Sequence, residues 1–136
     1  MHKELYHQET YLKLFYVPFE HIIIGDWIGK TSPTNMRKCF DLCLEAFDKY
    51  ACGTLVHEFR YGSADYRKIE DYIQDRWLKK SHEQGFKALA LVHPPQIFET
   101  LNMAASDFET EIDGDVLQIR NFKNRTPALN WLESMA

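Results

Sequence analysis

The chain has 136 residues, with 45% hydrophobic and 26% charged side chains and a formal net charge of -4 at pH 7; these values are typical of one globular domain, which we place at residues 1–136. Basic residues are interspersed with acidic ones, which argues against nucleic acid as a partner. The first five residues, MHKEL, lack the apolar run of a signal peptide, and no later stretch is long and apolar enough to span a bilayer, so we expect a cytoplasmic chain without stable membrane insertion.

The amino-terminal segment predicts an antiparallel pair of strands. Residues 11–15 alternate in polarity and place Leu12 and Leu14 on one face, and residues 21–27 form a β-branched run. The intervening residues form a short turn that contains Pro18. Residues 5–7 are a further candidate strand ahead of this pair.

A long helix is predicted next. Ser32-Pro33 starts it, because a serine caps exposed amides and a proline at the first helical position loses no hydrogen bond. The helix is expected to reach Ala51, with Gly53 as its left-handed stop. Its inward face recurs at three- and four-residue spacing and consists of Met36, Cys39, Phe40, Cys43, Phe47 and Tyr50.

The middle of the chain predicts a strand, a second helix and another strand. Residues 54–59 are typical of a half-buried strand, and a turn at residues 61–63 leads into a helix over residues 65–84 that Gly85 ends. Residues 86–92 are almost entirely apolar, which is typical of an interior strand covered on both faces. We therefore predict this run to be the central strand.

The last third of the chain predicts two helices around a strand. A third helix opens at Pro94-Pro95 and carries apolar residues as far as Ala105. Residues 106–115 carry carboxylates at every second position; this run lacks the order of an EF-hand loop and indicates a solvated edge strand or loop. Residues 116–122 form the last strand, and Thr126-Pro127 starts a closing helix.

Strands that alternate with helices need crossover connections. The predicted fold class is therefore α/β, with a mixed β-sheet of antiparallel N-terminal strands and parallel central strands, packed by about four helices. No glycine-rich phosphate loop follows a strand, since residues 59–62 read FRYG and residues 92–95 read VHPP. This argues against a nucleotide-binding Rossmann or P-loop fold.

Three local motifs carry a family resemblance: WIG at residues 27–29, GFKALALV at residues 85–92, and an F…A-x-x-W-L ending over residues 122–132. Together they resemble the SpoIIAA-like family, within the wider STAS and CRAL-TRIO-like folds, over nearly the whole chain. Each motif also has a structural interpretation, since Trp27 is a large apolar anchor and Gly29 permits a tight bend.

The resemblance implies a domain that acts by binding other proteins. Some STAS-type members are switched by phosphorylation of a serine at the start of the helix after a central strand, and the comparable position here holds Ser63. The surrounding residues 62–65, GSAD, depart from the family's Asp-Ser-Ser-Gly type of motif. A plain helix cap is therefore the competing interpretation of Ser63.

The cysteines and histidines do not predict a metal site. Cys39 and Cys43 have the spacing that two ligands on one helix face need, but no further ligand follows at a recognisable spacing. We predict that these two residues and Cys52 are free thiols in the core, with no metal and no cofactor. His57 and Glu58 point to opposite faces of one strand and cannot act as a pair.

His93 follows the predicted central strand, at the edge where open α/β sheets place their ligands. It is a candidate acid–base group, and a structural loop histidine is the alternative, because no partner can be placed beside it. We assign no catalytic residue. The candidate ligand or interface residues are Trp27, Tyr61, Ser63 and His93.

Aromatic residues crowd the amino-terminal strands, namely Tyr6, Tyr11, Phe15, Tyr16 and Phe19. An antiparallel pair cannot bury both faces against one small core, so we expect some of these rings to line a dimer interface or an apolar pocket.

Three function hypotheses follow from these patterns. The first is a non-enzymatic STAS-like regulatory or protein-interaction module that binds a protein partner or forms a homodimer. The second is a binder of a small apolar, lipid-like ligand in a pocket of CRAL-TRIO-like type. The third is an enzyme that uses His93 or His57.

Overall fold

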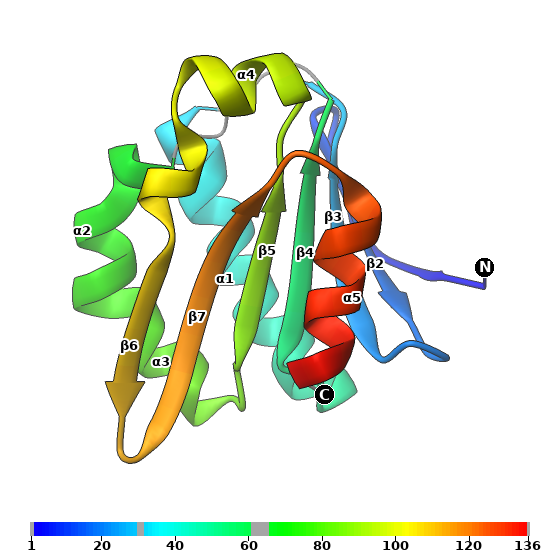
Figure 1. Ribbon diagram of the computed structural model, residues 1–136. Coiled ribbons are helices and arrows are strands. Elements are labelled where there is room, and N and C mark those ends of the chain that lie inside the picture. The colour runs from blue at the N-terminus through cyan, green and yellow to red at the C-terminus, as the bar shows by residue number, and fades with distance from the viewer. Residues whose placement is uncertain (1, 30–31, 61–65, 136) are drawn as a thin grey trace.

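The sheet runs in the order β1-β2-β3-β4-β5-β7-β6 in the computed structural model, which describes residues 2–29, 32–60 and 66–135 (Figure 1). The neighbours β3–β4, β4–β5 and β5–β7 are parallel, while β1–β2, β2–β3 and β6–β7 are antiparallel. The predicted α/β fold with a mixed sheet is therefore confirmed, as is the candidate first strand. The strands of the described residues are β1 Glu4–Gln8, β2 Leu12–Val17, β3 Ile22–Trp27, β4 Thr54–Phe59, β5 Ala88–Val92, β6 Phe108–Ile112 and β7 Asp115–Phe122.

The apolar run at residues 86–92 contains the interior strand β5. This strand is parallel to both of its neighbours, β4 and β7. Leu89 and Leu91 pack in the core on one face, and Ala88 and Ala90 pack on the other. The prediction of a strand covered on both faces is confirmed, although β4 holds the middle position of the sheet.

Helix α1 (Pro33–Tyr50) begins as predicted, because the Ser32 hydroxyl accepts a hydrogen bond from a backbone amide in the first turn. Its end differs from the prediction. Ala51, with φ of 48°, takes the left-handed conformation that we expected at Gly53. Gly53 has another role, since a Cβ there would lie 1.9 Å from the carbonyl oxygen of Gly85. A close approach of two backbone segments, and not a helix cap, therefore requires this glycine.

The second predicted helix is divided into consecutive helical segments. Its π-helical turn keeps Ile73 and Trp77 buried, and the Trp77 Nε1 donates a hydrogen bond to the Phe40 carbonyl oxygen in α1 at 2.8 Å. This bond ties the segment to α1. The segments are a 3₁₀ turn Tyr66–Ile69, α2 Glu70–Tyr72, a π-helical turn Ile73–Trp77 and α3 Leu78–Glu83.

The third predicted helix is shorter than expected. Helix α4 covers Pro95–Thr100, Asn102 adopts a left-handed conformation with φ of 49°, and a 3₁₀ turn follows at Met103–Ser106. The prediction of a helix as far as Ala105 was wrong because the backbone leaves the right-handed helical region at Asn102. The acidic run that follows forms the edge strand β6, which confirms one of the two structures predicted for it.

Helices cover the two faces of the sheet unequally. In Figure 1, α1, α2 and α3 lie behind the sheet, and α5 (Arg125–Met135) crosses in front of it. We call these the α1 face and the α5 face. In the part of the chain that the structure describes, no helix is long and apolar enough to cross a membrane. The α1 face buries the larger aromatic side chains, among them Trp27, Phe40, Phe47, Trp77 and Phe86.

Candidate functional site

One imidazole is enclosed in the core of the α1 face. The alternation of β4 turns Leu55, His57 and Phe59 toward α1, and His57 is only 1% exposed. His57 lies beside Gly25 of β3, where a Cβ would come within 3.1 Å of the imidazole ring. Glycine at this position therefore leaves the space that the buried ring occupies.

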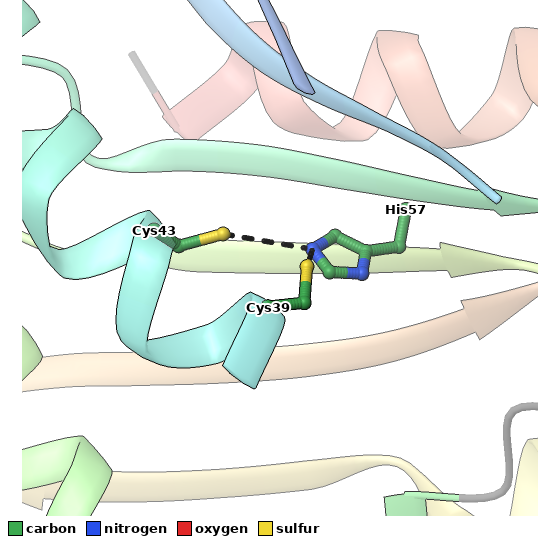
Figure 2. Close-up of side chains that lie close together, drawn as sticks. All are labelled: Cys39, Cys43 and His57. Carbon is green, nitrogen blue, oxygen red and sulfur yellow. Dashed lines mark hydrogen bonds between the residues drawn. The ribbon is translucent and has the colours of Figure 1, made fainter. Parts of the chain in front are cut away.

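Two cysteines of α1 reach the same imidazole (Figure 2). Cys39 and Cys43 lie about one helical turn apart on the buried side of α1, and each Sγ is 3.9 Å from the His57 Nε2. The three atoms lie within 4.8 Å of one another. We call these residues the cysteine–histidine cluster. It adds His57 to the two cysteines that their spacing in the sequence already placed on one helix face.

Trp27 determines which nitrogen of His57 carries the hydrogen. The Trp27 Nε1 donates a hydrogen bond to the His57 Nδ1 at 2.9 Å. Because the indole nitrogen is only a donor, Nδ1 must be the unprotonated nitrogen of a neutral ring. The hydrogen then lies on Nε2 and points toward the two sulfurs. The rings of Phe40 and Phe59 pack around the imidazole, with centroids 5.6 and 6.2 Å from it.

The cluster favours ionisation of one thiol. Hydrogen bonds from Cys39 and from His57 lower the pKa of Cys43 to about 6, against the effect of burial. Burial raises the pKa of Cys39 well above the usual thiol value, so this residue stays protonated and can donate. The arrangement therefore holds one thiolate, at Cys43, between two donors. A thiolate is the nucleophilic form of cysteine.

The same three side chains are of the types that bind soft metal ions. The sequence offered no third ligand for Cys39 and Cys43, and the structure supplies His57 because α1 packs across β4. The hydrogen bond from Trp27 nevertheless opposes coordination, since a histidine ligand normally donates its second N–H to an acceptor. A metal on Nε2 would place the hydrogen on Nδ1, where it would face the indole N–H. That no metal binds here stays a prediction, now with a physical reason.

His93 follows β5, at the predicted edge of the sheet, but its side chain is enclosed. The residue is 1% exposed, its Nε2 lies 2.8 Å from the Asn121 Oδ1, and its ring stacks on Phe59 at 5.3 Å. The Asn121 side-chain amide in turn donates to Asp107 at 3.1 Å. This chain of hydrogen bonds holds the ring in one orientation. The acid–base role of His93 stays a prediction.

The other candidates from the sequence lie in different places. Trp27 ends β3, is 1% exposed and uses its indole N–H on His57. Tyr61 and Ser63 lie outside the described residues, so their roles, including phosphorylation of Ser63, stay predictions.

A small cavity opens on the α5 face beside the β2–β3 hairpin. Its volume is about 150 Å³. We call it the α5 cavity; apolar residues Val17, Ile22, Ile24 and Leu129 and the acidic residues Glu20 and Glu133 line it.

The hairpin turn beside the α5 cavity carries two unusual side chains. Phe19 is 94% exposed. The Glu20 Oε2 is buried and has no hydrogen-bond partner among the described residues. The sequence singled out Phe19 as one of several crowded rings but gave no signal for Glu20, because an acidic residue in a turn is ordinary.

Comparison with known proteins identifies a family. The SpoIIAA-like family model matches residues 22–133, which is most of the chain. The matched region contains the whole cysteine–histidine cluster, whereas Phe19 and Glu20 precede it. No curated protein and no solved structure matches the chain.

Proposed function

The chain belongs to the SpoIIAA-like family, and from this premise we propose that it is a non-enzymatic regulatory module that binds a protein partner at the α5 cavity. The partner presents one apolar side chain flanked by basic groups. The observation that carries this proposal is the buried Glu20 Oε2, which no described residue hydrogen bonds. An unpaired buried carboxylate oxygen costs free energy, and rotation of this enclosed side chain toward a cationic donor on a partner would recover it.

The volume of the α5 cavity suits a single side chain. At about 150 Å³ it is smaller than the roughly 300–1,000 Å³ typical of small-molecule pockets. Its apolar wall includes Ile22, Ile24 and Leu129. Apolar anchors that fill pockets at the centre of an interface commonly supply much of the binding free energy.

The charge of the cavity defines the flanking groups of the partner. Glu20 and Glu133 come from two different elements, the hairpin turn and α5, and both line the cavity. No basic side chain lines it among the residues that the structure describes. Lysine or arginine beside the apolar anchor would form charge-assisted hydrogen bonds with these carboxylates.

Exposed apolar side chains extend this surface beyond the cavity. Phe19 is 94% exposed in the hairpin turn, and Leu5 of β1 is 53% exposed. Aromatic rings add a large contact area at little cost in conformational entropy. The other crowded aromatic residues of the amino-terminal strands divide between the faces: Phe15 packs on the α5 face, whereas Tyr6, Tyr11 and Tyr16 pack against the core of the α1 face.

The two alternative functions have less support. A lipid-like ligand would need more space than the α5 cavity provides. A larger hollow of about 660 Å³ lies along α1, but charged residues such as Arg37, Lys38 and Arg76 line it. An enzyme that used His93 would need a reacting group beside it, whereas its Nε2 faces the Asn121 Oδ1 and its ring packs against Phe59. Protein binding requires neither condition.

Photo-crosslinking from the hairpin turn tests the proposal. Benzoylphenylalanine replaces Phe19 or, as a matched control, Val116 of β7, which is 52% exposed and lies near the opposite end of the sheet. We expect one discrete protein adduct from position 19 in cells and none from position 116. Glu20→Lys with Glu133→Lys should reduce the adduct at least about tenfold, which corresponds to about 1.4 kcal/mol of binding free energy.

An adduct that survives this charge reversal, or equal labelling from both positions, contradicts the proposal. An adduct made of two copies of this chain contradicts a separate partner and favours a homodimer. Circular dichroism establishes that the charge-reversed protein is folded.

A further inference from the structure

We propose that Cys39 and Cys43 form a reactive thiol pair in which Cys43 reduces a hydroperoxide and Cys39 then forms a disulfide with it. This inference goes beyond protein binding and does not depend on the α5 cavity. Both sulfurs lie 3.9 Å from the His57 Nε2, and Trp27 keeps the hydrogen on that nitrogen. The geometry is that of a thiolate held by hydrogen-bond donors.

The two sulfurs are equally far from the His57 Nε2, so ionisation and not position makes Cys43 the nucleophile. Hydrogen bonds from Cys39 and His57 lower its pKa to about 6, so it is mostly ionised at neutral pH. The His57 Nδ1 accepts from Trp27, which leaves Nε2–H as a fixed donor to sulfur. Nearby donors that stabilise a thiolate favour reaction with peroxides. Because Cys43 is 0% exposed, the oxidant must be as small as hydrogen peroxide and must enter through a local opening of α1.

The reaction balances with a hydroperoxide as the oxidant. The Cys43 thiolate attacks one peroxide oxygen, so an S–O bond forms and the O–O bond breaks. The departing oxygen takes the proton of the Cys39 thiol and leaves as water or an alcohol. The new Cys39 thiolate attacks the sulfenic sulfur, an S–S bond forms, and hydroxide leaves with a proton from solvent. The two cysteines lose two electrons, and the peroxide gains them.

Because of the geometry of a helix, forming this disulfide must change the structure of α1. Residues four apart on a helix have Cβ atoms roughly 5–6 Å apart, whereas a disulfide needs roughly 3.5–4.5 Å. Helix α1 must therefore distort between Cys39 and Cys43 when the bond forms. Asp41 lies within this segment and accepts a hydrogen bond from Tyr72 of α2. Oxidation would thus alter the contact between α1 and α2.

Cys52 provides an internal control. It is also buried, but its Sγ donates to the carbonyl oxygens of His21 and Thr54 at 3.2 and 3.5 Å. Burial raises the pKa of its thiol, so it stays protonated. In an unfolded chain all three cysteines would react alike. A difference between Cys52 and the pair therefore reports on the folded protein.

Peroxide treatment of the native protein, followed by alkylation and mass spectrometry, tests the proposal. We expect loss of two hydrogen atoms, a peptide linked through Cys39 and Cys43, and a reduced Cys52. Cys39→Ser should stop at a sulfenic acid on Cys43 that dimedone traps. Cys43→Ser should lose the reaction, and Cys52→Ser should leave it unchanged.

Equal oxidation of all three cysteines, or no oxidation of the folded protein, overturns the proposal. Circular dichroism checks that each serine variant is folded. Trp27→Phe gives a second test that keeps both thiols but removes the donor to the His57 Nδ1. It should slow disulfide formation at least about tenfold, the effect of losing about one hydrogen bond, and an unchanged rate overturns the role of the fixed imidazole.

Discussion

The two faces of the sheet differ in whether their buried polar groups have hydrogen-bond partners. On the α1 face, His57 is buried among Trp27, Cys39 and Cys43, and these groups satisfy one another. On the α5 face, a single helix leaves a cavity whose Glu20 carboxylate keeps one oxygen without a partner among the described residues.

This difference in hydrogen bonding suits the two faces to different activities. Polar groups that are buried with all their partners hold one protonation state, which suits chemistry on a thiol. A polar group that lacks a partner beside an open apolar cavity suits recognition of another molecule. The first arrangement depends on tight packing, whereas the second depends on packing that is incomplete.

Truncating a side chain to alanine should therefore lower the free energy of unfolding much more on the α1 face than on the α5 face. Trp77→Ala removes a 1% exposed ring that contacts Phe40, Phe47 and Phe86, and we expect a loss of about 3–5 kcal/mol in the free energy of unfolding. Leu129→Ala should cost about 1 kcal/mol, because this side chain is already half-buried beside an open cavity. Denaturant unfolding measures both values, and equal losses would show that the α5 face is packed as tightly as the α1 face.

A smaller effect should appear within one strand. Gly25→Ala places a Cβ within 3.1 Å of the His57 ring, and we expect a loss of about 1–3 kcal/mol from overpacking. Ile24 lies next in sequence and faces α5, so Ile24→Val should cost only about 0.5–1.5 kcal/mol. Thermal unfolding compares the two variants. A Gly25→Ala protein as stable as the parent would mean that the imidazole does not occupy this space.

Most of the fold could be predicted because it follows from local patterns. The helix cap at Ser32 and the strand within residues 86–92 each depend on residues that are close together in the sequence, and the structure confirms both. The prediction failed at Gly53 because glycine is required there by the close approach of Gly85, a residue far away in the sequence. Likewise, the turn at Asn102 depends on backbone conformation and not on the pattern of apolar residues.

The cysteine–histidine cluster could not be predicted because it depends on tertiary register. The spacing of Cys39 and Cys43 shows that they share a helix face, and the alternation of β4 allows His57 to be buried. Only the packing of α1 across β4 brings the three together, and only the alignment of Gly25 with His57 leaves room for the ring. A glycine inside the strand sequence, Gly25, is a local signal of a close approach that the sequence analysis did not use.

The ionisation of Cys43 tests the central claim most directly. The ultraviolet absorbance of thiolate is followed against pH in the folded Cys52→Ser protein, with Cys52→Ser/Cys43→Ser as the control. Hydrogen bonds from Cys39 and His57 lower the pKa of Cys43 in the folded state, so the thiolate stabilises the fold at high pH and this stabilisation is lost as the pH falls through about 6. We predict a thiolate step near pH 6 that the control lacks. A first step at roughly pH 8.5, the value of an ordinary thiol, would contradict the account.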